Sequence, residues 1–159
     1  MINSNIHPPH CDTTVRTGSW QQLGSAAQAI RQAVFVEEQG IPAQLERDPA
    51  DTGCLHAVAF DAAGQAVGTG RLLPLPDGVM KLGRLAVLRS QRGQGVGQVL
   101  LQALLDAAHA QGAREVMLHA QQSAASFYLP AGFTVRGDEF IEAGLPHVEM
   151  VLVLDQDQS

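Results

Sequence analysis

The sequence has few cysteines and no long hydrophobic run. Its two cysteines, Cys11 and Cys54, fit neither a disulfide framework nor a metal-site spacing, so we expect free thiols in a reducing compartment. Near Cys11, two prolines separate His7 from His10 and no fourth ligand is close, which favours a disordered leader over a metal site. No apolar run approaches the about 18 residues of a membrane-spanning helix, and no secretory signal pattern is present. We therefore expect a cytoplasmic protein with no metal and no membrane partner.

The chain is also poor in charged residues, which make up 16% of it, while hydrophobic residues make up 45%. This composition is typical of a soluble globular protein. Lysine and arginine number 10 against 16 aspartates and glutamates, and the net charge of −6 argues against a nucleic-acid partner. We expect a single domain over residues 13–155, preceded by a flexible leader over residues 1–12.

The stretch from Lys81 to Gly112 is predicted to form a strand, a glycine-rich turn and a helix. Leu82–Leu88 is largely apolar, as in a buried strand, and Arg92–Gly97 follows as the turn. Apolar residues then recur at helical spacing up to Gly112, a natural helix end. The first amides of a helix lack partners within it, the helix dipole adds positive charge there, and glycines let a ligand approach closely. The turn therefore predicts a phosphate or pyrophosphate site.

The turn departs from two common phosphate-binding motifs. A Walker loop ends in Gly-Lys-Ser/Thr, whereas Gly97 is followed by Gln98. A dinucleotide fingerprint needs a later third glycine and an acidic residue about 20 residues further on. A glycine-rich connection without a ligand is the structural alternative.

We predict the element order β-α-β-β-β-α-β-α-β-β, a mixed sheet carrying helices. The predicted strands are Thr13–Thr17, Leu55–Asp61, Ala66–Leu73, Leu82–Leu88, Arg114–Ala120, Phe133–Arg136 and His147–Leu154. The predicted helices run from about Trp20 to Glu38, from Val96 to Gly112, and from a Ser123 cap through Ala131. Residues 43–53 and 137–146 are predicted loops. The crossover through the central helix implies that the strands before and after it are parallel.

Arg92, Gly95 and Gly97 resemble the Arg-x-x-Gly-x-Gly signature of the GNAT superfamily of N-acetyltransferases. Ser126–Phe133 is similar to the F-Y-x-x-x-G-F stretch of that family, and the family fold has the predicted element order. Arg31–Gln39 and Phe140–His147 resemble a bacterial subgroup of uncharacterised single-domain members, so the resemblance covers roughly residues 14–154. It implies the acyl-CoA N-acyltransferase fold, α/β of the mixed α+β kind. Its central, mostly antiparallel sheet of about six to seven strands is flanked by helices and splayed at the cofactor site.

The resemblance also implies acetyl-CoA as cosubstrate. In the family, the strand before the loop pairs its backbone with the pantetheine arm, the loop amides hold the pyrophosphate, and a tyrosine protonates the leaving thiolate. The matching cofactor-binding residues here are Leu85, Ala86, Val87, Arg92, Gly93, Gln94, Gly95, Val96 and Gly97, and the matching catalytic acid is Tyr128.

The implied reaction is direct acetyl transfer to a primary amine of a small molecule or peptide. A neutral amine attacks the thioester, a backbone amide near Val87 could stabilise the oxyanion, and a phenol can protonate the leaving thiolate. No covalent enzyme intermediate is needed, so neither cysteine is required. A homodimer is the assembly common in the family.

The acceptor side is defined only by residue type. Candidate general bases are His56, Glu37, Glu142, His119 and His147. Arg71 lies in the middle of a strand and either binds an acceptor carboxylate or pairs with a structural acid such as Asp48. We assign Arg71, Glu142 and His147 to acceptor binding.

Two departures from the family pattern bear on the site. Pro130 removes one hydrogen bond from the short helix that carries Tyr128. Gln121 and Gln122 stand where many members have an asparagine, so no asparagine contact is assigned. Two other functions compete with the enzyme: a non-catalytic module that senses acyl-CoA, and an oxidoreductase that binds a nicotinamide cofactor through the glycine loop.

Overall fold

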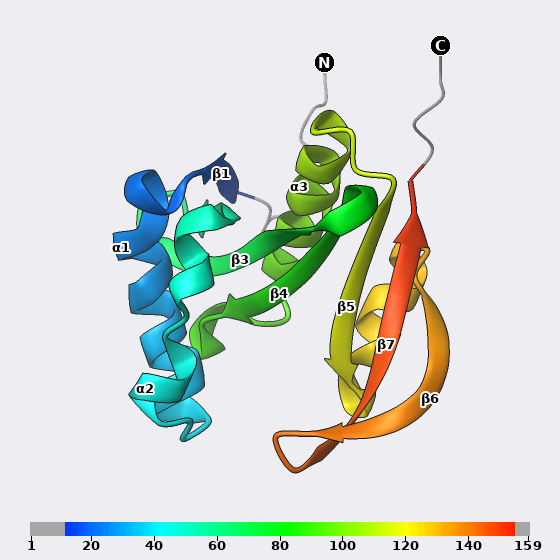
Figure 1. Cartoon of the computed structure of the whole chain (residues 1–159). Coiled ribbons are helices and arrows are strands. Elements are labelled where there is room, and N and C mark those ends of the chain that lie inside the picture. Colours follow the sequence, from blue (N-terminus) through cyan, green and yellow to red (C-terminus); the bar gives the residue numbers. More distant parts are fainter. Residues whose placement is uncertain (1–11, 155–159) are drawn as a thin grey trace.

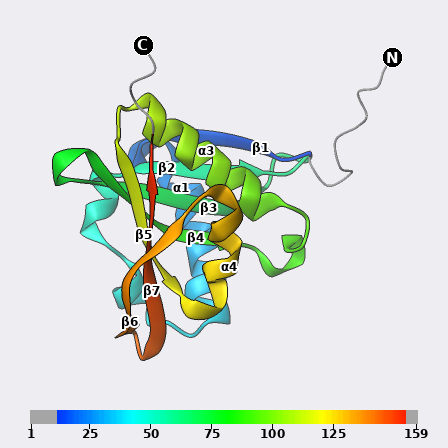
Figure 2. The same cartoon turned by 90° about the vertical axis from the view of Figure 1, so that its right-hand side faces the viewer.

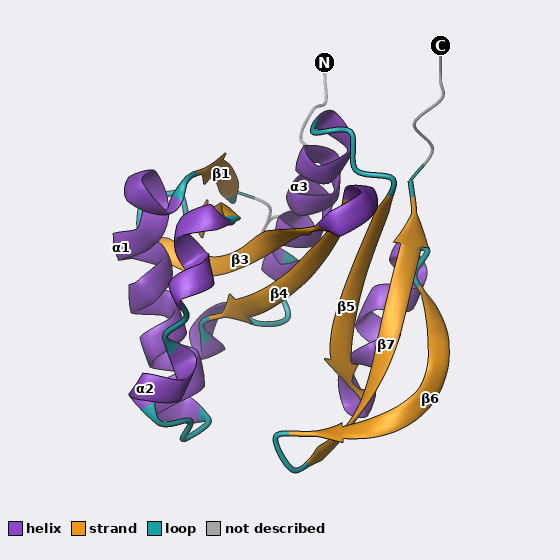
Figure 3. Ribbon diagram, viewed as in Figure 1, coloured by secondary structure: helices purple, strands orange, loops and turns teal. Residues whose placement is uncertain are grey.

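The computed structural model describes residues 12–154 and contains one seven-stranded sheet in the order β1-β2-β3-β4-β5-β7-β6 (Figures 1 and 3). The strands are β1 Thr14–Gly18, β2 Leu55–Phe60, β3 Ala66–Leu75, β4 Val79–Val87, β5 Glu115–Gln121, β6 Thr134–Glu142 and β7 Leu145–Val153. The α-helices are α1 Trp20–Arg31, α2 Ala43–Glu46, α3 Val96–Ala110 and α4 Ala125–Tyr128. Among these described strands only β4 and β5 pair in parallel, which confirms the predicted crossover and the mixed, mostly antiparallel sheet.

Helices cover the sheet on two faces. In Figure 2, α3 and α4 lie in front of the sheet and α1 lies behind it. Two glycines of β3 allow α3 to approach closely, because an added Cβ would lie 2.8 Å from Leu100 Cδ1 at Gly68 and 2.8 Å from Leu104 Cδ1 at Gly70. On the opposite face, Ile30 packs against the strand residue Ala86 in a separate apolar cluster. The sheet is therefore the middle layer of three.

The parallel strands β4 and β5 diverge soon after they meet. Their pairing is confined to Val79–Lys81 of β4 and Glu115–Met117 of β5. Further along β4 a bulge shifts its register with β3, and Arg84 adopts a left-handed backbone with φ of 51° there. A bulge of this kind bends a strand and increases its twist. The separation of the ribbons is visible in Figure 1, and it confirms the predicted splayed sheet.

The helix predicted from Trp20 to Glu38 has the expected extent but not a uniform geometry. Ser19 caps α1 by accepting a hydrogen bond from the amide of Gln22. After Arg31 the chain continues as a π-helical segment, Gln32–Glu38, which ends before Gly40. π-Helical segments are rare in proteins, and those that do occur often lie at functional sites.

The prediction of a loop over residues 43–53 is wrong. This stretch forms α2 and a 3₁₀ turn over Pro49–Gly53, and its acidic residues Glu46 and Asp51 are buried. They are buried because Arg31 of α1 and Arg71 of β3 reach them and supply the opposite charge. Hydrophobicity alone cannot predict an acidic segment that folds inward in this way.

The predicted loop over residues 137–146 is wrong as well. β6 and β7 are longer than predicted and meet at a tight turn, where Ala143 and Gly144 have φ of 53° and 77°. Successive left-handed residues are what a two-residue hairpin turn requires. Gly137, with φ of 82°, lies at a register shift between Arg136 and Phe140. This bulge interrupts the alternation of side chains by which a strand is recognised in a sequence.

The short helix after β5 also differs in detail. Ser123 lies in a 3₁₀ turn over Gln122–Ala124, and α4 begins after Ala124 with no side-chain cap. At the other end, α4 stops at Tyr128 and a 3₁₀ turn containing Pro130 follows. This is consistent with the hydrogen bond that proline removes from a helix.

The described residues bear on two expectations, the absence of a metal site and the absence of a membrane-spanning helix. Among residues 12–154 no group of histidine, cysteine, aspartate or glutamate side chains could hold a metal ion. No helix in this part of the chain is both long enough and apolar enough to cross a membrane. Cys54 is a buried free thiol, whereas Cys11, His7 and His10 lie outside the described residues.

Candidate active site

The glycine-rich turn leads directly into α3. Gly93 and Gly95 have φ of 78° and 85°, a left-handed conformation that favours glycine, and Gly95 is the residue that precedes the helix. No side chain of residues 12–154 caps the helix, so its first amides are left for another partner. Gly97 lies against α4, where an added Cβ would be 3.3 Å from Phe127 Cζ. The predicted anion-binding turn therefore has the backbone that such a site needs.

Arg92 of this turn is bound to the π-helical segment. Its Nη1 and Nη2 each lie 2.7 Å from a carboxylate oxygen of Glu38, and its Nε donates to the carbonyl of Val87 at 2.9 Å. Arg89 reaches the same carboxylate at 3.3 Å. The hydrogen bond from Arg92 lowers the pKa of Glu38 below its usual value. Glu38 appears in the sequence prediction only as the end of a helix, and no signal in the sequence links it to this turn.

A neutral substitution at Glu38 should tighten the binding of inorganic pyrophosphate. An anion at the turn has to displace this carboxylate from the two arginines, and an exposed ion pair offers only weak resistance. We expect Glu38→Gln to lower the dissociation constant by up to about fivefold in titration calorimetry. Glu37→Gln makes the same charge change on the neighbouring exposed residue. Equal effects of the two substitutions would mean that pyrophosphate binding depends on the overall charge and not on the contact between Glu38 and the arginines, which would contradict the prediction.

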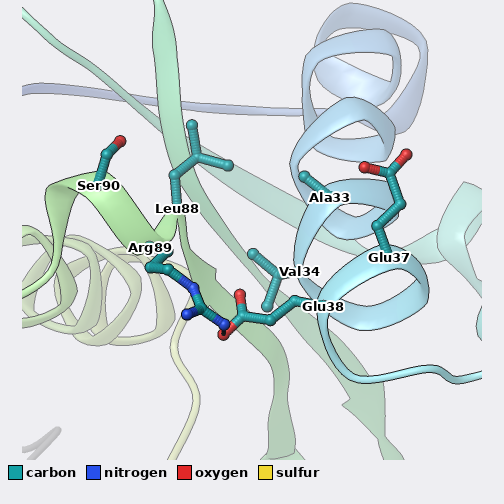
Figure 4. A pocket seen from close by; sticks show the side chains of 7 residues that line it. All are labelled: Ala33, Val34, Glu37, Glu38, Leu88, Arg89 and Ser90. Carbon is teal, nitrogen blue, oxygen red and sulfur yellow. Dashed lines mark hydrogen bonds and ion pairs between the residues drawn. The ribbon is translucent and has the colours of Figure 1, made fainter.

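A cavity of about 530 Å³ lies between the π-helical segment and the residues that follow β4. In Figure 4, Arg89 and Glu38 point toward one another across it, while Glu37 points to the outer side of the helix. The remaining lining residues are Ala33, Val34, Leu88 and Ser90. The cavity is thus apolar at its base and carries the ion pair at its rim.

The predicted pantetheine-binding strand segment is the part of β4 that has left β5. Ala86 is buried against α1, while Leu85 and Val87 are partly buried and pack on the main core. Because β4 and β5 pair only over Val79–Lys81, the β5-facing edge of this segment pairs with no strand in the part of the chain that the structure describes. It can offer backbone groups to an extended ligand.

Tyr128, the single tyrosine of the chain, lies at the end of α4. Its ring packs edge-on against Phe127 and Phe133, at centroid distances of 5.0 and 5.8 Å. Burial raises the pKa of Tyr128 to about 12, so the phenol keeps its proton throughout the physiological range. Within the described residues its hydroxyl makes no hydrogen bond, which leaves it able to donate to a ligand.

Arg71 lies in a buried ion network rather than beside an open pocket. Its Nη1 is 2.8 Å from Asp51 Oδ1 and its Nη2 is 2.7 Å from Asp48 Oδ2. The pairing with Asp48 that the sequence left open is therefore present. His56 is also buried here, with Nε2 2.9 Å from the carbonyl of Asp51, and burial lowers its pKa. We leave both residues out of the proposed acceptor site.

The other two predicted acceptor residues lie together. Glu142 of β6 contacts His119 of β5, with Oε1 3.0 Å from Nδ1, and its Oε2 is 4.0 Å from His147 Nε2. Glu149 of β7 lies on the opposite side of the His119 ring. Both histidines and Glu142 are separate candidates in the sequence, which carries no signal that they meet and none for Glu149. Their role in binding an acceptor stays a prediction.

Comparisons with known proteins agree with this geometry. A profile described as the acetyltransferase (GNAT) domain matches residues 18–154. The uncharacterized N-acetyltransferase YjcF of Bacillus subtilis is 41% identical over 123 residues, which are 77% of this chain and 86% of YjcF. An acyl-CoA N-acyltransferase from Pseudomonas aeruginosa shares the fold with a TM-score of 0.78 and 29% identity, over 87% of this chain and 98% of that one. Escherichia coli ElaA matches with a TM-score of 0.77 and 27% identity over the same shares.

Proposed function

Since the chain belongs to the acetyltransferase (GNAT) domain family, we propose that it transfers an acetyl group from acetyl-CoA directly to a primary amine. The observation that carries this proposal is the divergence of β4 from β5 beside the uncapped start of α3. An extended thioester can pair with the open strand edge while its phosphates reach the helix amides.

The loop supplies the phosphate contacts in this proposal. Gln94, Gly95, Val96 and Gly97 offer the amides, and Arg92 turns from Glu38 to the pyrophosphate. Leu85, Ala86 and Val87 supply the strand edge for the amide groups of pantetheine. The acetyl carbonyl then lies in the divergence, where a backbone amide near Val87 can stabilise its developing negative charge.

The reaction removes two protons from the acceptor nitrogen and supplies one proton to the leaving sulfur. The acceptor ammonium first loses a proton, and its nitrogen lone pair forms the new C–N bond at the thioester carbonyl. The tetrahedral intermediate gives a second proton from nitrogen to solvent as the C–S bond breaks. Tyr128 gives its phenolic proton to the departing thiolate and is reprotonated from solvent. The products are an N-acetylated amine, coenzyme A and one released proton.

Thermal unfolding with acetyl-CoA tests the cofactor assignment. A ligand at 100 times its dissociation constant stabilises by about 2.7 kcal/mol, which is roughly 5–10 °C for a chain of this size. We expect this shift with acetyl-CoA and none with NADH. Gly95→Glu should abolish it, because the side chain strains a left-handed residue and places negative charge at the phosphate site.

Gly64→Glu provides the matched control. Gly64 has φ of 83° at the β2–β3 turn, so the substitution imposes similar strain away from the glycine-rich loop. This variant should melt lower than the wild type but keep the acetyl-CoA shift. A Gly95→Glu variant that kept the full shift would refute the loop assignment. Binding without thiol release across a panel of amines would favour the acyl-CoA-sensing alternative.

A further inference from the structure

His119 lies on the part of β5 that has separated from β4. It comes two residues after Met117, the last residue of β5 that pairs with β4. Its neighbours Leu118 and Ala120 are buried in the core cluster against which Tyr128 packs. Because side chains alternate along a strand, His119 points to the opposite face of the sheet. Tyr128 and His119 thus approach the divergent strands from the two sides of the sheet.

Both ring nitrogens of His119 face carboxylates. Nδ1 lies 3.0 Å from Glu142 Oε1 and Nε2 lies 3.5 Å from Glu149 Oε1. The ring of Phe140 packs edge-on against the imidazole at 5.0 Å and fixes its orientation. The side chain of Glu142 is 49% exposed, so a solute can reach this group.

The hydrogen-bonding capacity of a neutral imidazole does not match these partners. A neutral ring carries one donor and one acceptor, whereas ionised carboxylates only accept. In the neutral form, one ring nitrogen of His119 would therefore face a carboxylate without a hydrogen between them. An added proton, or the N–H groups of an ammonium ion, would complete the contacts with Glu142 and Glu149.

The charges around His119 favour a cation. Arg136 of β6 binds Glu149 at 2.6 Å and Glu115 of β5 at 3.1 Å, and the hydrogen bond from Arg136 lowers the pKa of Glu149. Among the described residues Glu142 has no arginine partner, and its ion-pair partners there are His119 and His147. His147 also uses its Nδ1 on the carbonyl of Leu145. Glu142 is therefore the carboxylate left for an incoming ammonium group.

We propose that Glu142 binds the ammonium group of the acceptor and that His119 takes its proton, which makes the acceptor a cationic amine. This inference rests on the proposed acetyl transfer. The proton moves from the ammonium nitrogen to an imidazole nitrogen and leaves a neutral amine with its lone pair free. The imidazolium formed donates to both carboxylates, and it returns the proton to solvent after the acetyl group has moved.

Nitrogen NMR of the 159-residue chain tests this site directly. We expect butylamine or spermidine at millimolar concentration to shift the ring-nitrogen resonances of His119, and butan-1-ol, which carries no charge, to leave them unchanged. Glu142→Gln should abolish the response, while Glu139→Gln, an exposed residue of the same strand, should keep it. Ring nitrogens that neither amine moves would overturn the inference.

Kinetics separate a proton acceptor from a structural residue. With an amine that supports thiol release, His119→Gln should lower kcat/KM by about 10²–10⁴ near neutral pH. Its rate should recover as pH approaches about 10.4, where a lysine-like ammonium loses its own proton. A deficit that stays constant with pH would indicate a structural role and overturn the inference. Absence of an acetyl-CoA melting shift would instead refute the proposed function, whereas a normal shift with an unresponsive His119 would refute this inference alone.

Discussion

Asp51→Ala is expected to lower the free energy of unfolding by about 3–5 kcal/mol, because it leaves two buried arginines without their shared carboxylate. Asp51 accepts from Arg31 Nη1 and Nη2 at 2.9 and 3.0 Å, and from Arg71 Nη1 at 2.8 Å. All three residues are buried. Removing Asp51 leaves the buried positive charges without the carboxylate that compensates their desolvation.

Urea unfolding followed by circular dichroism measures this effect, and the melting temperature should fall by roughly 6–20 °C. Glu139→Ala removes an exposed carboxylate from β6 and should change stability by no more than about 0.5 kcal/mol. If Asp51→Ala lowered the free energy of unfolding by less than about 1 kcal/mol, water or a rearrangement would have replaced the contacts that the two arginines lose, and the prediction would be wrong.

The Asp51 carboxylate also makes the free energy of unfolding depend on pH in the acid range. Burial alone would raise the pKa of Asp51, but the hydrogen bonds from Arg31 and Arg71 outweigh it and hold the pKa below its usual value. Its contribution is therefore complete above the unfolded pKa of about 3.9 and is lost as pH falls through the lower folded pKa. Asp51→Ala should remove this part of the acid limb of a stability–pH curve.

Tyr128→Phe should lower kcat by about 10²–10⁴ and leave the affinity for acetyl-CoA unchanged, because it removes only the proposed proton donor. The ring contacts with Phe127 and Phe133 are kept, and the hydroxyl makes no hydrogen bond within the described residues. The melting temperature should therefore change little.

The pH profile provides a second measurement on the same variant. Since the pKa of Tyr128 is raised to about 12, the phenol stays protonated well above neutral pH, and any alkaline loss of wild-type activity below that value has another source. Tyr128→Phe should consequently lower the rate without moving the profile. An unchanged kcat at every pH would show that the tyrosine only packs the core.

The central part of the fold was predictable because its signals are local. Gly95 and Gly112 mark the two ends of α3, and the apolar spacing between them is that of a helix. The parallel pairing of β4 and β5 then follows from the crossover rule. The divergence of these strands was expected from the family resemblance alone, since nothing in the spacing of residues signals a strand that leaves its neighbour.

The ion network and the His119 group were not predictable because their members are far apart in the sequence. Acidic residues such as Glu46 and Asp51 indicate a loop unless the arginine that will meet them is known. Glu142 reaches His119 only because the β6–β7 hairpin has one particular register, set by its turn and by the bulge near Gly137. A register of that kind depends on tertiary packing as well as on the turn.

The short ladder between β4 and β5 has a mechanical consequence. Three residue pairs are all that join the two strands, so the sheet consists of two panels, β1–β4 and β5–β7, with α3 as the connecting segment. A thioester lying between the panels would form hydrogen bonds with the strand edges of β4 and β5. These would replace the backbone hydrogen bonds that the two strands do not form with each other beyond the three pairs. The bound cosubstrate would then act as a temporary eighth strand, and loss of the acyl group would leave coenzyme A in that place until the panels release it.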